Sequence, residues 1–431
     1  MTNILIITYY WPPAGGAGVQ RWVKLSKYLK RAGVNPIILT VDEQSASYMQ
    51  LDPSLENDVA DDLEVIKTKS FEPINWYAKM VGKKNVPTAG FSNVNNKKWS
   101  QRIVNYIRSN LFIPDPRKGW NKFALKAATK LIQQENISLV ITSSPPHSSQ
   151  LIGLKLKNSL GIKWIADMRD PWTDIYYFDQ IGHSRYSKAI SKRMEKAVLM
   201  HADKVITVSN SLVELFRKKD VNIDPEKFVV VPNCFDPEDF ENLEKVQNDF
   251  FHIVYTGSMS AQYAPDVFFE ALKESISGKP GLQIQVTMVG EVADEIKAFI
   301  EKIEIKVHFK ETVPHSSINQ WQKNADLLLL VIPNVKESEG ILTGKLFEYL
   351  ASGNPILGIG PENGDAAHIL RECQCGDMFN RNQLPQIVDH LLTAFERFEN
   401  HSIHSVNESC VKLYSRQKQA EDIHQLIMRL S

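Results

Sequence analysis

The stretch Thr343-Gly344-Lys345-Leu-Phe-Glu348 combines a glycine, a lysine and a glutamate at the start of a predicted helix. The first backbone amides of a helix, the helix dipole and a lysine ammonium all attract an anion such as a phosphate. Lys345 and Glu348 stand three residues apart and therefore share one helix face. The alternative is a surface ion pair that contributes little. The glycine before the lysine and the Gly353-Asn-Pro355 stop favour an anion site.

Two glycine-containing turns are also suited to an anion. Trp11-Pro-Pro-Ala-Gly15-Gly16-Ala-Gly18 lies between a predicted strand and a predicted helix, and Tyr255-Thr-Gly257-Ser258 leaves another strand. Glycines allow backbone amides to approach an anion closely. The first loop does not fit the G-x-G-x-x-G fingerprint of dinucleotide-binding proteins. A tight turn between strand and helix is the alternative.

Polar side chains that could contact a second substrate follow two further predicted strands. His147, in Thr142-Ser-Ser-Pro-Pro-His147, precedes a predicted helix, where an imidazole could take up or donate a proton. A capping or surface role is the alternative. Asp167 and Asp170 flank Arg169, and their carboxylates could bind sugar hydroxyls. An Asp-Pro turn with an internal ion pair is equally compatible with these residues.

The elements that must position these residues form two series. Short β-branched runs alternate with longer amphipathic stretches, which is typical of parallel sheets covered by helices. Ligands of such sheets bind beyond the carboxyl ends of the strands, so the site is expected in a cleft between two sheets. The polar stretch 232–249 is the predicted linker, and Glu408–Leu430 is predicted as one last helix. The strands are expected at residues 4–8, 36–40, 63–67, 139–142, 164–167, 205–208, 228–231, 252–256, 283–289, 306–309, 327–332 and 355–359.

The overall composition excludes several classes of protein. A chain of 431 residues exceeds the roughly 250–300 residues of a single core, which predicts two domains. Lys plus Arg and Asp plus Glu each total 50, which argues against a nucleic-acid partner. The four cysteines are expected to be reduced thiols of a cytoplasmic protein. No signal peptide, membrane span or metal-binding cluster is predicted, so any membrane contact would be peripheral.

The neutral average conceals a basic segment at residues 76–120. Nine basic residues stand there against one acid, Asp115, so the rest of the chain carries an excess of eight acids. Residues 97–112 can form a basic amphipathic helix, which suits anionic lipid headgroups. The hypothesis is peripheral attachment to the inner face of the cytoplasmic membrane. A solvated helix packed on its own domain is the alternative.

Taken together, the motifs resemble the family 4 glycosyltransferases, which have the GT-B architecture of two Rossmann-like doubly wound domains facing a cleft. No single motif is specific, but their order extends over nearly the whole chain. The motifs are the Gly15–Gly18 loop, Ser143-Ser-Pro-Pro-His147, Ala202-Asp-Lys-Val-Ile-Thr-Val-Ser209, Val231-Pro-Asn-Cys-Phe-Asp236, Val254-Tyr-Thr-Gly257 and the stretch from Lys345 to Pro355.

The resemblance implies an organisation of the chain. It implies an N-terminal acceptor domain at 1–235 with the insertion 76–120, a C-terminal nucleotide-sugar donor domain at 250–404, and a last helix at 405–431 that packs back on the N-terminal domain. It also implies retaining transfer of a sugar from a nucleoside diphosphate sugar, with neither cofactor nor metal. The expected acceptor is a sugar or a lipid-linked sugar of envelope polysaccharide.

The resemblance also implies roles for single residues. Glu348 would bind the donor ribose, and Lys345 the diphosphate. His147 would lie near the reacting sugar, and the loop of Gly15, Gly16 and Gly18 would close on the substrates. Asp167 and Asp170, considered above from their residue types alone, are the candidates for contact with the acceptor. The remaining donor-binding residues would be Gly257, Ser258, Gly290, Glu291, Thr343 and Gly344.

The sequence departs from the family pattern at two places. Gly340 stands where a second glutamate is common, and no Arg or Lys follows Gly257 within Ser258-Met-Ser260-Ala-Gln262. Lys345 would then be the principal cation on the diphosphate. Two other functions keep the same fold: a sugar-nucleotide epimerase, and a binding or scaffold subunit that has lost catalysis.

Overall fold

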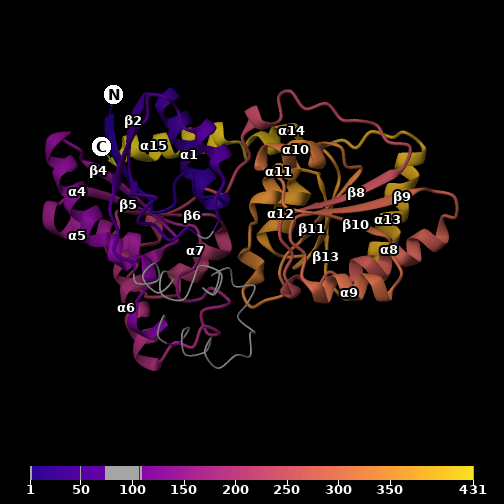
Figure 1. Ribbon diagram of the computed structural model, residues 1–431, viewed down its shortest axis with the longest axis horizontal. Helices are drawn as coiled ribbons and strands as arrows, with labels where there is room; N and C mark the ends of the chain where they lie inside the picture. Colours follow the sequence, from indigo (N-terminus) through magenta and orange to yellow (C-terminus); the bar gives the residue numbers. More distant parts are fainter. Residues whose placement is uncertain (1, 49, 73–105, 107–108, 431) are drawn as a thin grey trace. The chain divides into compact units, whose positions relative to one another are not determined.

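The computed structural model describes residues 2–48, 50–72, 106 and 109–430 (Figure 1). The chain forms two compact units. Unit 1 comprises Met1–Pro232 with Gln419–Ser431, and unit 2 comprises Asn233–Lys418. Each unit contains one parallel sheet with helices on both faces, so the α/β fold class predicted from the sequence is confirmed.

The sheet of unit 1 has seven strands in the order β3-β2-β1-β4-β5-β6-β7. Its central strands are runs of Ile, Leu and Val with almost no exposed surface, because helices cover both faces. The strands are β1 Thr2–Ile7, β2 Val34–Val41, β3 Glu64–Thr68, β4 Leu139–Ser144, β5 Lys163–Met168, β6 Lys204–Thr207 and β7 Phe228–Val230. The helices are α1 Ala17–Arg31, α4 Asn121–Gln134, α5 Gln150–Leu160, α6 Arg185–His201 and α7 Asn210–Arg217.

The C-terminal helix α15, Arg416–Leu430, packs on unit 1. Ile423 and Ile427 lie in the same hydrophobic core as Ile4 of β1. The prediction of a single helix at residues 408–430 is wrong in one respect. The segment is divided into two helices, α14, Glu408–Lys412, and α15. The division occurs because Phe235 forms backbone hydrogen bonds with residues 414 and 416, which removes this short stretch from the helix.

The sheet of unit 2 has six strands in the order β10-β9-β8-β11-β12-β13. The sequence patterns did not predict the last strand and the last covering helix, β13 Gly376–Phe379 and α13 Leu384–Glu399. The other strands are β8 Phe251–Thr256, β9 Ile284–Val289, β10 Val307–Lys310, β11 Leu327–Val331 and β12 Ile356–Ile359. The other helices are α8 Asp266–Gly278, α9 Asp294–Lys302, α10 His315–Lys323, α11 Gly344–Ser352 and α12 Asp365–Glu372.

A glycine in the middle of α5 gives a test of the packing in unit 1. A Cβ at Gly153 would lie 2.1 Å from Nε1 of the buried Trp164. Ala normally stabilises a helix by about 1 kcal/mol relative to Gly. We expect Gly153→Ala instead to lower the free energy of unfolding by about 1–3 kcal/mol, because the indole has no room to move. Urea unfolding measures this change, and Asn158→Ala on the exposed face of α5 is the matched control. An equal or higher stability of Gly153→Ala would contradict the packing described here.

The cysteines differ from the expectation of four reduced thiols. Cys373 and Cys410 form a disulfide with a Cα–Cα distance of 5.1 Å, while Cys234 and Cys375 are buried free thiols. The pairing was not visible in the sequence because the two cysteines are 37 residues apart. They meet because the backbone amide of Asn407, just before α14, donates to the carbonyl of Cys373 at the end of α12.

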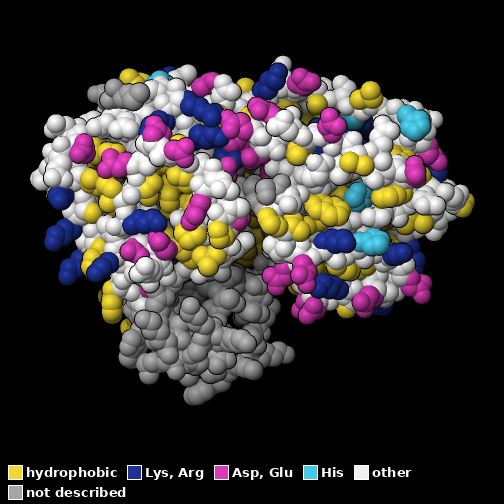
Figure 2. Space-filling model, turned by 45° about the horizontal axis from the view of Figure 1, so that its top comes forward, with side chains coloured by type: hydrophobic (Ala, Val, Ile, Leu, Met, Phe, Trp, Pro, Cys, Tyr) yellow, Lys and Arg dark blue, Asp and Glu magenta, His cyan; other side chains and the backbone are white. Residues whose placement is uncertain are grey.

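The basic segment 76–120 lies largely outside the described residues, including most of the predicted helix 97–112. One of its cations does not contribute to a basic surface. Arg117 is 5% exposed and donates from Nη2 to the carbonyl of Ser47, because its chain segment packs into unit 1. In the part of the chain that the structure describes, none of the helices is apolar over enough residues to span a membrane. Basic and acidic side chains are interspersed over the face shown in Figure 2.

Candidate functional site

The carboxyl ends of the strands of unit 2 bring two glycine turns together. Gly257 follows β8 and Gly290 follows β9, and the amide of Gly257 donates to the carbonyl of Val289 at 2.8 Å. Both glycines have positive φ values, of 99° and 125°. A Cβ at Gly290 would lie 2.7 Å from the carbonyl oxygen of Gly257. Only glycine fits at Gly290, so the two turns can lie against each other with their backbone exposed toward a ligand.

Lys345, on the first turn of α11, extends to the Gly257 turn. Its Nζ donates to the hydroxyl of Tyr255 at 2.5 Å and lies 4.0 Å from the centre of the same ring. Tyr255 in turn donates to the carbonyl of Ser258 at 2.8 Å. A Cβ at Gly257 would lie 3.2 Å from the lysine Nζ. The strand end, the glycine turn and the helix N-terminus therefore hold one ammonium at a fixed place.

Burial lowers the pKa of Lys345 to about 7, and the negative charge of Glu348 opposes this effect only in part. No carboxylate forms an ion pair with this ammonium among the residues described here. A cation held in this way gains its proton fully when an anion binds beside it. The site is therefore electrostatically suited to a phosphate rather than to a neutral ligand.

Glu348 lies one turn further along α11. Its Oε2 accepts a hydrogen bond from Nε2 of Gln322 at 2.7 Å, and the same amide donates to Oγ1 of Thr256 at 3.1 Å. The other carboxylate oxygen has no hydrogen bond within the described part of the protein. Thr343, which caps α11, has a buried Oγ1 without a hydrogen-bond partner. Ser258 and Glu291 are exposed at the same edge of the sheet.

In unit 1 the predicted residues also lie at the carboxyl ends of the strands. Gly15 and Gly16 follow β1, and Gly16 caps α1 with a φ of 102°. His147 follows β4 and stacks on Trp172, with ring centres 5.1 Å apart and planes at 8°. The Nδ1 atom of His147 is buried and has no hydrogen-bond partner in the described residues.

The structure changes the chemistry expected of His147. Burial, followed by the charge of Arg169, lowers the pKa of this imidazole to about 3. His147 is therefore neutral at physiological pH and a weak base, and its exchange of a proton with a substrate stays a prediction. A neutral ring can still contact a sugar or donate one hydrogen bond.

The low pKa of His147 gives a prediction for acid stability. The unfolded chain takes up the proton near pH 6.5, whereas the folded chain takes it up only near pH 3. The free energy of unfolding should therefore fall as the pH is lowered from about 6.5 to 3, by up to about 1.4 kcal/mol per pH unit from this residue. Urea unfolding of the parent and of His147→Asn at pH 6.5 and 5 measures the difference. Identical slopes in the two proteins would contradict this pKa.

Asp167 is completely buried at the end of β5. Its two oxygens accept hydrogen bonds from Arg21 at 3.1 and 3.3 Å, from Nε1 of Trp22 at 2.8 Å and from Oγ of Ser143 at 2.9 Å. Arg21 also has no exposed surface. No oxygen of Asp167 can reach a ligand, so the structure replaces the predicted acceptor-binding role with a structural one.

Asp170 differs from Asp167 because its carboxylate is half-buried and has no hydrogen bond to the described residues. Burial raises its pKa, and Arg169 opposes this rise. Gly18 lies beside the guanidinium of Arg169: a Cβ at this position would lie 2.7 Å from Nη2. Asp170 and the glycine loop thus occupy the same edge of the sheet.

Sequence reasoning did not assign roles to several residues of these arrangements. Tyr255, which positions Lys345, stands at a strand end before a glycine turn, and this pattern could have identified it. Gln322 contacts Glu348 from α10, and no local signal marks it. Asp115 accepts from the amide and the hydroxyl of Ser148, next to His147, at 2.7 and 2.8 Å.

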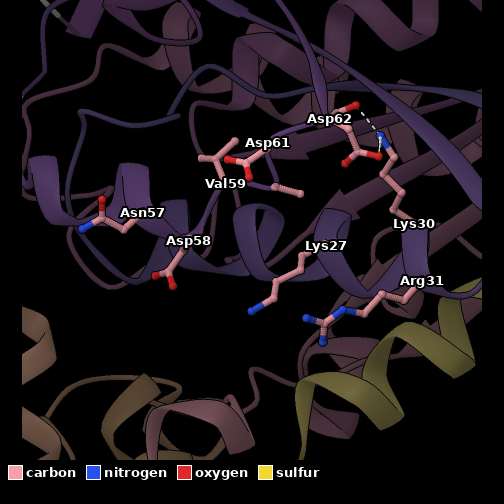
Figure 3. A pocket seen from close by; sticks show the side chains of 9 residues that line it. Lys27, Lys30, Arg31, Asn57, Asp58, Val59, Asp61 and Asp62 are labelled. Carbon is pink, nitrogen blue, oxygen red and sulfur yellow. Dashed lines mark hydrogen bonds and ion pairs between the residues drawn. The ribbon is translucent and has the colours of Figure 1, made fainter.

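A pocket of about 490 Å³ in unit 1 lies at the opposite edge of the sheet (Figure 3). It is lined by the last turns of α1 and by the loop that precedes β3, so it is close to the amino ends of β2 and β3. Its basic side chains stand among acidic ones, including the ion pair of Lys30 and Asp62 at 2.8 Å. Position and mixed charge separate this pocket from the candidate site.

Comparisons with known proteins agree with the arrangement. The model of Glycosyltransferase Family 4 matches residues 86–239, and that of Glycosyl transferases group 1 matches residues 251–397. Among curated proteins, none matches this sequence.

Solved structures share the fold at low sequence identity. The HepE protein of Anabaena, in complex with UDP, is 12% identical with a TM-score of 0.64, and the alignment covers 100% of both chains. Sucrose-phosphate synthase of Thermosynechococcus elongatus is 14% identical with a TM-score of 0.62, covering 100% of this chain and 99% of the other. A UDP-N-acetylglucosamine 2-epimerase assigned in Listeria monocytogenes is 11% identical with a TM-score of 0.56, covering 98% and 94%.

Proposed function

The chain belongs to the family 4 glycosyltransferases, and we propose that it transfers a sugar from a nucleoside diphosphate sugar to an acceptor with retention and without a metal ion. The family and the GT-B fold support an enzyme of this class. The structural relative from Anabaena holds UDP, which supports a nucleotide donor. Retention and metal independence follow from the family resemblance and are part of the proposal.

The observation that carries the proposal is the ammonium of Lys345 between Tyr255, the Gly257 turn and the start of α11. We assign the diphosphate to this place. The free oxygen of Glu348 then accepts from the ribose hydroxyls, and the unpartnered hydroxyl of Thr343 donates to a phosphate oxygen. Backbone amides and side chains that complete the donor site are those of Gly257, Ser258, Gly290, Glu291 and Gly344.

The leaving group explains why a cation is needed there. Cleavage of the anomeric C–O bond leaves positive charge on the sugar and negative charge on the nucleotide phosphate. Lys345 and the first amides of α11 are in place before the reaction begins and stabilise the negative charge on the phosphate as it forms. Such preorganised groups are an effective form of electrostatic catalysis. The neutral imidazole of His147 would contact the reacting sugar, and the Gly15–Gly18 loop would exclude water.

The proposed acceptor is a sugar or a lipid-linked sugar of envelope polysaccharide, reached from the inner face of the cytoplasmic membrane through residues 76–120. The basic residues of this segment other than the buried Arg117 support the proposal. Co-sedimentation with anionic liposomes tests it, comparing the parent with a variant in which Lys97, Lys98, Arg102 and Arg108 are changed to Glu. Anionic vesicles should retain the parent only, and a parent that does not sediment with them would refute membrane attachment.

A panel of sugar nucleotides tests the transferase function. Each donor is incubated with the protein and a membrane lipid extract, and the release of free nucleoside diphosphate is measured. One donor should be consumed only when the extract is present. Conversion of a donor without release of nucleotide would instead indicate the epimerase, an activity that the structural relative from Listeria carries in its name. If the protein neither binds nor turns over any donor, the result would indicate the scaffold subunit. Gly340 and the missing cations after Gly257 favour this alternative.

A further inference from the structure

Arg169 lies at the carboxyl end of β5 in unit 1, where the mechanism above does not use it. Its Nε donates to the carbonyl of Ser144 at 3.1 Å, and this bond fixes the plane of the guanidinium. The two terminal nitrogens lie beside Gly18, where an added Cβ would be 2.7 Å from Nη2 and 2.9 Å from Nη1. A side chain at position 18 would therefore collide with the guanidinium of Arg169, and glycine avoids this collision.

Burial lowers the pKa of Arg169, and the negative charges of Asp170 and Asp167 oppose this effect without a direct contact. Neither terminal nitrogen has a hydrogen-bond partner, and no carboxylate forms an ion pair with it, within the described ranges. Asp167 is close in sequence, but Arg21, Trp22 and Ser143 occupy its oxygens. Arg169 is half-buried. Removing a cation from water without a direct ion pair costs stability, so this position needs an explanation outside the folding of the chain.

The planar fork of an arginine matches two oxygens of a phosphate or a carboxylate. Arg169 stands at the edge of the sheet where ligands of parallel sheets bind. The adjacent carboxylate of Asp170 is also without a hydrogen bond in the described residues and can accept from a hydroxyl. We propose that Arg169 binds an anionic group, a phosphate or a carboxylate, on the sugar acceptor, while Asp170 accepts from a neighbouring hydroxyl.

This proposal rests on the transferase function and narrows it to acidic acceptors. The proposal makes no assumption about the donor site, because all the residues that it involves belong to unit 1. Binding of an acceptor analogue can therefore be measured without knowing the donor. Nucleotide binding by unit 2 is a separate measurement, so either proposal can fail while the other holds.

The test uses calorimetric titration with alkyl glycosyl phosphates, the corresponding uncharged alkyl glycosides and the corresponding alkyl uronides, for a panel of sugars. The parent should bind one charged series more tightly than the uncharged glycosides. The glycosyl phosphate carries its anion at the anomeric carbon and the uronide carries a carboxylate at C6, so the preferred series identifies both the kind and the position of the anionic group on the acceptor. Arg169→Gln should weaken binding of that series roughly ten- to a hundredfold, as expected for lost charge-assisted hydrogen bonds.

Two further variants separate binding from folding. Arg169→Lys keeps the charge without the fork and should recover part of the affinity. Gly18→Ala displaces the guanidinium and should weaken binding of the charged series more than binding of the uncharged glycosides. Lys163→Gln removes a cation from the other end of the same strand and is the matched control. The proposal is wrong if the parent does not prefer a charged probe, or if Arg169→Gln weakens charged and uncharged probes equally.

Discussion

Replacement of Lys345 by Ala should lower kcat/KM for the donor roughly 10²–10³-fold, the range measured when a preorganised charge partner of a transition state is removed. The only cation that the structure holds at the Gly257 turn, among the residues described, is this ammonium. Affinity for the intact donor should fall less, roughly ten- to a hundredfold, because in the ground state the oxygen that bridges sugar and phosphate carries less charge than in the transition state. Steady-state kinetics and calorimetry measure the two quantities. Tyr255→Phe is the companion variant, since it removes the hydroxyl that positions Nζ but keeps the ammonium.

The pKa of Lys345 adds a pH dependence with a defined sign. With a pKa of about 7 in the free protein, the side chain loses its charge as the pH rises from 7 to 9. A nucleoside diphosphate is already fully ionised in that range. Its affinity should therefore fall as the pH rises, by up to tenfold per unit. Lys345→Arg keeps its charge at every pH in the range and should show no such decline. The same decline in both proteins would mean that Lys345 does not contact the phosphates.

The sequence predicted the parts of the fold that depend on local patterns. Most strands buried on both faces have a run of Ile, Leu or Val, which is visible without knowing their neighbours. β13 was missed because Gly376-Asp-Met-Phe379 is short and polar. Its place is set by a contact distant in sequence: a Cβ at Gly376 would lie 1.8 Å from the carbonyl oxygen of Ile356 in β12. A glycine required by a neighbouring strand cannot be distinguished from a turn glycine in the sequence.

The candidate site was predictable to a similar extent. Residues that follow strands, such as Gly257 and Lys345, were identified because parallel topology places strand ends at one edge. The state of each side chain was not predictable, because it depends on partners far away in sequence. Asp167 and Asp170 look equivalent in the sequence, yet one is bonded to Arg21 across 146 positions and the other has no such partner among the described residues. The neutral state of His147 has the same origin, since burial by distant segments sets its pKa.

The buried pair of Arg21 and Asp167 predicts the largest loss of stability. Asp167→Asn keeps the shape of the side chain but leaves the guanidinium of Arg21 buried without a counter-charge. We expect the free energy of unfolding to fall by about 3–5 kcal/mol, measured by urea unfolding followed by tryptophan fluorescence. Asp62→Asn is the control, because it breaks the ion pair between Asp62 and Lys30. The carboxylate of Asp62 is 74% exposed. That change should cost less than about 1 kcal/mol.

The double variant Arg21→Met with Asp167→Leu separates charge from packing. A buried ion pair replaced by apolar side chains of similar size often leaves stability unchanged or raises it. The double variant should therefore recover much of the stability lost in Asp167→Asn, even though it lacks every bond from Arg21. It should still bind acidic acceptor analogues less well, because Asp167 also anchors Ser143, whose neighbour Ser144 holds Arg169. A double variant less stable than Asp167→Asn would show that the bonds of Arg21, rather than its uncompensated charge, stabilise this end of β5.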